Sequence, residues 1–226
     1  MKSPLRKRLP RELKSEFGKY LVVFIMMAIT IGFVSGFLVA DGSMLRAYDD
    51  SFQKYNIEDG YFQTKKKLTP AQEEDIEKSD VKVYENFYIE QKLTNGSTIR
   101  FFKNRKEVDK VCLMKGKMPK KSGEIAVDRM YADNNELKVG DTVKSRKKTF
   151  RITGLVALSD YSALFQNNND TMFDAVKFGV AIVTDKDFEA LNQVKVQYNY
   201  AWIYDKKPAT EKKETVSYTH LTLPTT

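Results

Sequence analysis

Few residues of this chain have the types and spacing that catalysis or metal binding requires. Cys112 is its only cysteine and His220 its only histidine, which excludes a Cys/His zinc site and a Ser-His-Asp triad within the chain. The acidic runs at residues 49–50 and 73–75 lie in polar stretches with a helical pattern, where solvated surface charge is expected. Residues 167–170 lack the spacing of a calcium-binding EF-hand loop. We therefore expect no catalytic residue, no cofactor and no metal site.

Nucleotide and nucleic-acid binding are also not indicated. The sequence contains neither the phosphate-binding loop of an ATPase nor the glycine fingerprint of a dinucleotide fold. Its basic runs at residues 65–67 and 146–148 have no interleaved aromatic residues. The net charge of +8 is concentrated at the N-terminus, because residues 1–19 contain seven basic and only two acidic side chains. We expect a chain that is not an enzyme and has no nucleic-acid partner.

The elements that organise this chain begin with an uncharged apolar run at residues 20–40. As a helix of about 31 Å, this run is long enough to cross a membrane. A cleaved signal peptide is the alternative, but the run exceeds the usual length and Leu38 lies two positions before the best cleavage site, Ala40. The basic segment 1–19 predicts a cytoplasmic N-terminus next to anionic membrane lipid, with the remainder extracytoplasmic.

Small residues recur every four positions within this predicted membrane helix, at Ala28, Gly32, Gly36 and Ala40. Such a stripe lets a second helix approach closely, so it predicts a packing face. Composition alone is the other explanation, because glycine and alanine are common in membrane helices.

Residues 41–56 predict a stalk helix, since Leu45, Tyr48, Phe52 and Tyr55 form one apolar stripe that would dock on the outer domain. A short surface helix of that domain is the alternative. Residues 57–206 then predict a mixed α+β domain with mainly local antiparallel hairpins. The helices start at a Thr69-Pro70 capping signal and at Thr184. Strands are predicted around residues 61–62, at 81–89, on both sides of the Asn95-Gly96 turn, at 139–143 and 149–154, at 179–183 and at 196–204.

The end of the sequence differs in composition from the rest. Residues 207–214 are rich in lysine and acid and are predicted to be a linker. Residues 215–226, which have five threonines and no charge, resemble a translated sequencing adapter, and we expect them to be non-native. A genuine polar tail is the alternative.

An ordered set of glycine motifs lies in the middle of the outer domain, from Gly116 to Gly154. Asp141 can bond backbone amides at a turn, and the glycines suit turns or close backbone approach. The set resembles the extracytoplasmic core domain of FtsX/MacB-like ABC transporter permeases, over Arg11 to about Lys206. There the pattern is G-x-x-P, G-E-I-x-V, L-x-V-G-D-x-V and a strand ending in glycine, matched here by Gly116, Pro119, Gly123, Glu124, Val139, Gly140, Asp141 and Gly154.

The resemblance implies a permease subunit that works with a separate cytoplasmic ABC ATPase and with a second permease copy or half. It implies that ATP-driven movement reaches the outer domain, for export or handling of a peptide, lipid-linked or antibiotic substrate. Such permeases have several membrane helices, so this chain would be an N-terminal fragment of one. A single-span protein with a ligand-binding or sensor domain is the second hypothesis, and a membrane-anchored enzyme ranks last.

Overall fold

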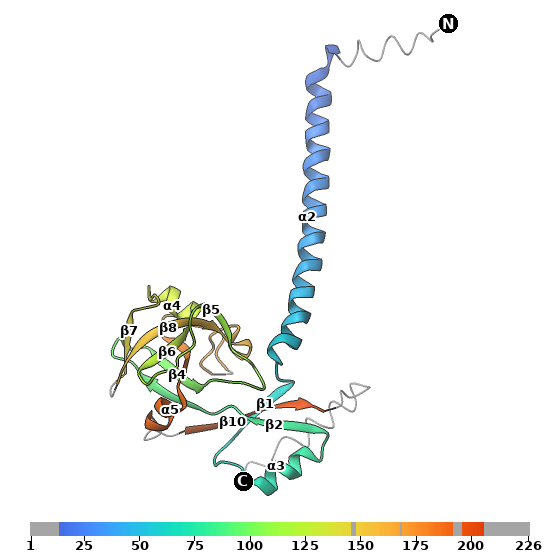
Figure 1. The fold of residues 1–226 in the computed structure, drawn as a ribbon. Helices are drawn as coiled ribbons and strands as arrows, with labels where there is room; N and C mark the ends of the chain where they lie inside the picture. Colours follow the sequence, from blue (N-terminus) through green and yellow to red (C-terminus); the bar gives the residue numbers. More distant parts are fainter. Residues whose placement is uncertain (1–13, 146–147, 168, 192–195, 206–226) are drawn as a thin grey trace. The chain divides into compact units, whose positions relative to one another are not determined.

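The computed structural model describes residues 14–145, 148–167, 169–191 and 196–205 (Figure 1). The predicted linker 207–214, the predicted adapter-like tail 215–226 and most of the basic segment 1–19 lie outside these residues. The chain divides into two compact units, Met1–Ser51 and Phe52–Thr226.

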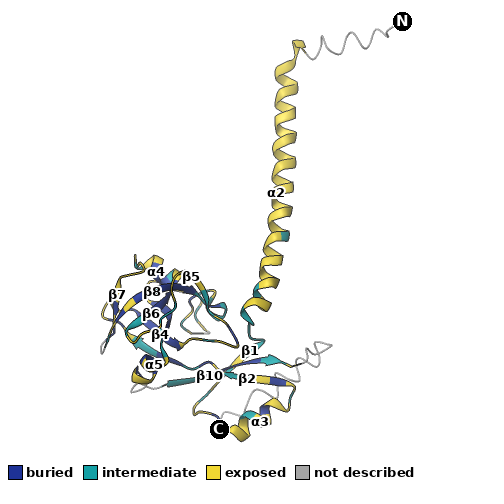
Figure 2. Ribbon diagram, in the orientation of Figure 1, coloured by how far each residue is buried: buried dark blue, intermediate teal, exposed yellow. Residues whose placement is uncertain are grey.

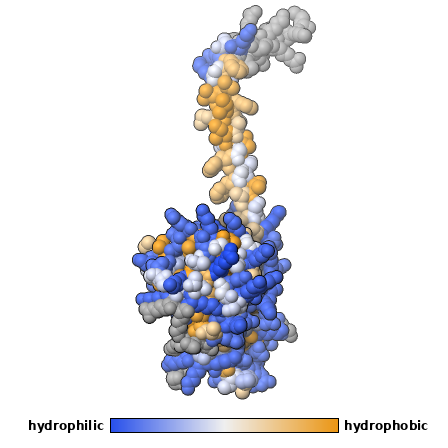
Figure 3. Space-filling model, turned by 60° about the vertical axis from the view of Figure 1, so that its left-hand side comes forward, coloured by the Kyte–Doolittle hydropathy of each residue, from blue (hydrophilic) through white to orange (hydrophobic). Residues whose placement is uncertain are grey.

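Helix α2 (Phe17–Tyr55) is continuous through both the predicted membrane segment 20–40 and the predicted stalk 41–56. By length and composition it can cross a membrane, since its 39 residues extend about 58 Å. None of its residues is buried (Figure 2), and apolar side chains lie along much of its length on the face that Figure 3 shows. Of the apolar stripe proposed for the stalk, Leu45 and Tyr48 are exposed, whereas the Tyr55 hydroxyl donates to Cys112 Sγ at 3.0 Å.

The remaining elements form the mixed α+β domain predicted from the sequence, and this prediction is confirmed. Its helices are α3 (Pro70–Glu77), α4 (Arg129–Asn134), the 3-10 turn η1 (Ser159–Tyr161) and α5 (Asp185–Leu191). Its strands are β1 (Gly60–Thr64), β2 (Val81–Glu85), β3 (Tyr88–Lys92), β4 (Thr98–Lys103), β5 (Cys112–Gly116), β6 (Glu124–Asp128), β7 (Thr142–Lys144), β8 (Thr149–Ala157), β9 (Phe178–Val183) and β10 (Val196–Tyr204).

The sheet is not built mainly from local hairpins, and that expectation was wrong. Strand order is β1-β10-β3-β4-β9-β6-β8-β5, with β2 also on β10 and β7 also on β8. Only β3–β4 and β7–β8 join strands that follow one another in the chain, while β4–β9 and β6–β8 are parallel. The reason is visible in β9, because all six of its residues are buried. A strand that is apolar on both faces belongs in the middle of a sheet.

Two hydrophobic cores divide this domain into two lobes, which we call the large lobe and the small lobe. The large lobe surrounds β4, β6, β8 and β9. The small lobe contains α3, β1 and β2 and packs around Leu68, Ile76, Val81, Tyr200 and Trp202. Strand β10 runs through both lobes, since it pairs with β1, β2 and β3 (Figure 1). The chain also passes between the lobes from β2 to β3.

The local start and turn signals are confirmed. Thr69 and Gln72 form the predicted capping box at the start of α3, and Pro70 is the first helical residue. The Asn95-Gly96 turn closes the β3–β4 hairpin, with Gly96 at φ 88° and Leu93 N donating to Ser97 O at 2.8 Å. Thr184 caps α5, whose Asp187 N donates to Thr184 Oγ1 at 3.2 Å.

Two predicted strands have different bounds. Residues 81–89 form β2 and β3, interrupted at Asn86 and Phe87, where the chain passes from the small lobe to the large one. Strands β2 and β3 pair with β10 in the same register, so the chain bends at the interruption without shifting its pairing to β10. Residues 139–141 are not in β7, because Gly140 at φ 109° and the Asp141 side chain make a turn there, and Val139 is 39% exposed.

Candidate functional site

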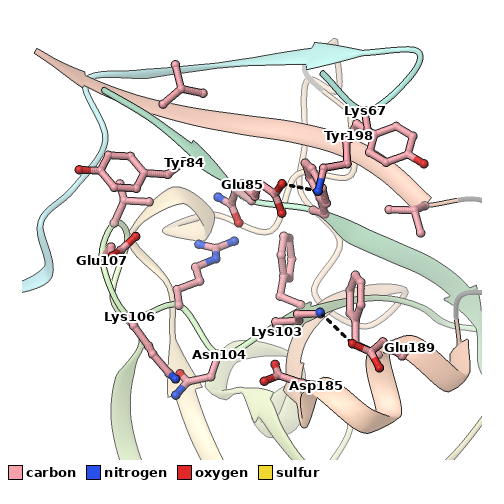
Figure 4. A pocket seen from close by; sticks show the side chains of 18 residues that line it. Lys67, Tyr84, Glu85, Lys103, Asn104, Lys106, Glu107, Asp185, Glu189 and Tyr198 are labelled. Carbon is pink, nitrogen blue, oxygen red and sulfur yellow. Dashed lines mark hydrogen bonds and ion pairs between the residues drawn. The ribbon is translucent and has the colours of Figure 1, made fainter. Parts of the chain in front are cut away.

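A groove of about 810 Å³ lies in the domain that follows α2. Two runs of consecutive residues form its walls, residues 83–87 on one side and 102–108 on the other. Parts of α5, the start of β10 and Lys67 complete the lining, as Figure 4 shows. Its volume is within the range of known ligand pockets.

The groove forms because two paired strands separate. Strands β3 and β4 are paired as far as Tyr88 and Phe102. Beyond this pair, β2 continues along β10, whereas the chain after Lys103 turns away toward Val108. The groove occupies the fork between them.

Ion pairs stand at the rim of this fork. Lys67 Nζ lies 2.6 Å from Glu85 Oε1, and Lys103 Nζ lies 3.5 Å from Glu189 Oε1 (Figure 4). All four side chains are well exposed, so each pair contributes little to stability. Four basic and four acidic residues line the groove, which gives it no dominant charge.

A buried amide lies where the chain crosses between the lobes. Asn86 N donates to Asn199 O at 2.8 Å, which continues the ladder between the β2–β3 segment and β10. The Asn86 side chain is 3% exposed and lines the groove, yet within the described residues neither its Oδ1 nor its Nδ2 has a hydrogen-bond partner. A buried polar group without a partner is costly, so such a group calls for an explanation.

A buried cluster of charges stands beside the groove. Arg105 Nη1 donates to Asp160 Oδ1 at 2.6 Å, and the guanidinium lies 4.3 Å from the centre of the Phe102 ring. Asp109 is fully buried and accepts from Glu58 N at 3.1 Å. Burial first, and then the carboxylates of Asp109 and Asp160, raise the pKa of Glu58 to about 9. Burial and Asp160 also raise the pKa of Asp109. One arginine therefore faces three carboxyl groups, and Glu58 holds a proton at neutral pH.

Asp187 holds α5 in place. Its buried carboxylate accepts from Ser122 Oγ at 2.6 Å, from Gly123 N at 2.8 Å and from Thr184 Oγ1 at 3.0 Å, and it also pairs with Lys148 Nζ. Burial opposes ionisation, but these bonds together hold the pKa of Asp187 below its usual value. Asp185, Phe188 and Glu189 on the same helix line the groove. The turn at Gly123 thus positions one wall of the groove through Asp187.

The sequence motifs lie in turns and strand contacts of the large lobe. Gly116 faces Gly154 in the β5–β8 ladder, and a side chain at Gly154 would place its Cβ 2.6 Å from Lys117 O. Gly116 and Gly123 have φ of 80° and 88°. The motif carboxylates accept bonds from nearby main-chain groups, Glu124 from Lys120 N and Lys121 N and Asp141 from Lys138 N. None of the predicted motif residues, Pro119 and Val139 included, lines the groove.

The small-residue stripe that was predicted as a packing face lies on helix α2. Ala28, Gly32, Gly36 and Ala40 are exposed on α2. Among the residues that the structure describes, no group of three His, Cys, Asp or Glu side chains could hold a metal ion.

The sequence did not single out four of the residues described above, namely Asn86, Arg105, Glu58 and Asp187. Only Asp187 had a usable signal, since it follows Thr184 at the spacing of a helix cap.

No family model matches the chain, and no curated protein sequence matches it. Several solved structures are similar, and two of them are described here. The periplasmic region of MacB from Actinobacillus actinomycetemcomitans has 13% identity and a TM-score of 0.40, and the match covers 71% of this chain and 74% of that chain. The extracellular domain of the noncanonic ABC-type transporter YknZ from Gram-positive bacteria has 10% identity and a TM-score of 0.36, covering 69% and 86%.

Proposed function

We propose that this chain is part of a permease subunit of an ABC transporter of the FtsX/MacB type. The observation that carries the proposal is the ordered motif set from Gly116 to Gly154, which follows a helix long enough to span a membrane. In this proposal a separate cytoplasmic ATPase hydrolyses ATP, and its movement reaches the outer domain. The outer domain uses this movement for the export or handling of a peptide, lipid-linked or antibiotic substrate.

The proposed organisation follows the sequence. Residues 1–19 lie at the cytoplasmic face against anionic lipid, residues 20–40 cross the membrane, residues 41–56 form the stalk, and residues 57–206 form the extracytoplasmic domain. The basic residues of segment 1–19 support this orientation, because positively charged flanks stay in the cytoplasm. The absence of ionisable residues between positions 20 and 40 supports mechanical coupling over proton or ion relay by this helix.

The small-residue stripe is proposed as the contact with a second permease copy or half. Gly36→Leu is expected to weaken self-association of the membrane helix about tenfold, since a large side chain keeps two helix backbones apart. A membrane two-hybrid assay measures this association. Val34→Leu, on the opposite side of the helix, is the matched control and should leave it unchanged. Equal association of Gly36→Leu and the parent chain would remove the stripe from the proposal.

Sequencing of the gene locus past codon 226 tests the proposed function. The permease hypothesis expects the reading frame to continue beyond residue 214 into further apolar spans, with an ABC ATPase gene alongside. A frame that ends without further spans, and with no ATPase gene nearby, would contradict it.

One observation favours a second candidate function. A groove of about 810 Å³ within a domain carried by one apolar helix also fits a membrane-anchored ligand-binding or sensor protein. The same locus experiment separates the two, because a sensor of this kind needs neither further spans nor an ATPase.

A further inference from the structure

The groove runs along the edge of a strand. Residues 83–87 of the β2–β3 segment all line it. Successive side chains of a strand point to opposite faces, so a cavity over one face would be lined by alternate residues only. Five consecutive residues in one lining therefore indicate that the cavity follows the strand edge.

The main-chain groups on this edge can be assigned. Asn86 N donates to β10, and alternate residues of an antiparallel strand face the same partner. Val83 and Glu85 therefore direct their N–H and C=O groups away from β10, toward the groove. Val83 N meets the Glu77 carboxylate at 3.4 Å, and within the described chain β2 pairs with β10 alone. The Glu85 N–H is thus an available donor at the centre of the edge.

The fork has the surroundings that an added strand would need. Strands β2 and β3 share one edge, the side that faces away from β10. Strand β4 pairs with the β3 part of this edge and leaves the β2 part without a neighbouring strand in the described chain. Five aromatic side chains line the space: Tyr84, Phe87, Phe102, Phe188 and Tyr198. Asn86 adds a buried carboxamide, which can both donate to and accept from a peptide group.

We propose that this groove binds an extended peptide segment, which adds to the β2 edge as an extra strand between β2 and residues 103–108. Main-chain bonds to the Glu85 N–H and to the carbonyl groups of Val83 and Glu85 would supply affinity, and the aromatic lining would select apolar side chains at alternate positions. The balanced charge of the lining disfavours phosphate or nucleic acid, which need a dominant positive field. The site does not depend on an ATPase partner, so it can be tested on this chain alone.

The test is a selection of displayed random heptapeptides on the full chain in lipid nanodiscs, with empty nanodiscs as counter-selection. Enriched peptides are resynthesised, and their Kd is measured by fluorescence polarisation. Glu85→Pro removes the groove-facing N–H and leaves the ladder to β10, so it should raise Kd about tenfold, the equivalent of one hydrogen bond. Glu85→Ala is the matched control, because it loses the ion pair to Lys67 and keeps the N–H.

A second measurement uses the unchanged protein. Each peptide amide is N-methylated in turn, and alternate positions should lose affinity, because only alternate N–H groups of an added strand face β2. Bound peptide should also slow hydrogen exchange of the Glu85 amide. The proposal is overturned if no peptide is enriched over empty nanodiscs, if methylation shows no period of two, or if the Glu85 amide exchanges at the same rate when peptide is bound.

Discussion

Asp187→Ala should lower the stability of the large lobe by about 3 kcal/mol, because it leaves a buried set of donors without their acceptor. The carboxylate is fully buried and is the shared acceptor for Ser122, Gly123 and Thr184. The Gly123 N–H loses the acceptor that it has in the parent chain, and the Lys148 ammonium loses its counter-charge. The loss should therefore exceed that of an ordinary surface ion pair.

Hydrogen exchange of the β9 amides measures this change, because β9 is fully buried and precedes α5. Asp185→Ala is the matched control. Asp185 is in the same first turn of α5 but is exposed, so its removal should cost less than about 1 kcal/mol through the helix dipole alone. Equal protection of β9 in Asp187→Ala and the parent chain would show that Asp187 does not anchor the helix.

Local sequence signals predicted the elements well, because each signal acts within a few residues. The capping box at Thr69 needs only Gln72, and the Asn95-Gly96 turn needs only its two flanking strands. The apolar run of β9 likewise predicted a buried strand. These features depend on backbone geometry and local hydrogen bonds, which neighbouring residues determine.

Pairings between distant segments could not be predicted in this way. Strand β9 lies between β4 and β6, and it pairs with β4 in parallel although a long stretch of chain separates them. Its position follows from the burial of both its faces, which the sequence indicates, but its partners follow from the packing of the whole lobe. The bend at Asn86 and Phe87 has the same origin, because it depends on where the two lobes meet.

The candidate groove was the least predictable feature. Its walls come from β2, from the chain after β4, from α5 and from β10. Glu58 and Arg105 are far apart in the sequence, and neither lies in a motif that would bring them together. The glycine motifs act on the groove only indirectly, through Gly123 and Asp187.

Glu58→Gln should flatten the fall in stability that the parent chain shows as pH rises from 5 to 9. The pKa of Glu58 is about 9 in the folded chain against an ordinary value of 4.5, so the folded state holds a proton that the unfolded state has released. The native state then binds more protons than the unfolded state, and stability decreases with rising pH by up to about 1.4 kcal/mol per pH unit. This contribution is fully present below about pH 4.5 and is lost toward pH 9.

Trp202 reports this transition. It is the only tryptophan, it is buried, and its carbonyl accepts from Asp59 N at 3.0 Å, next to Glu58. Urea unfolding followed by its fluorescence should give equal stability for Glu58→Gln and the parent chain at pH 5, and a gain of about 4 kcal/mol for the variant at pH 8. Because burial and Asp160 also raise the pKa of Asp109, the residual slope of the variant reports Asp109. Glu74→Gln is the control, because Glu74 is exposed on α3, and its stability should change with pH as in the parent chain. If the stability of Glu58→Gln also changes with pH as in the parent chain, Glu58 is ionised in the folded chain.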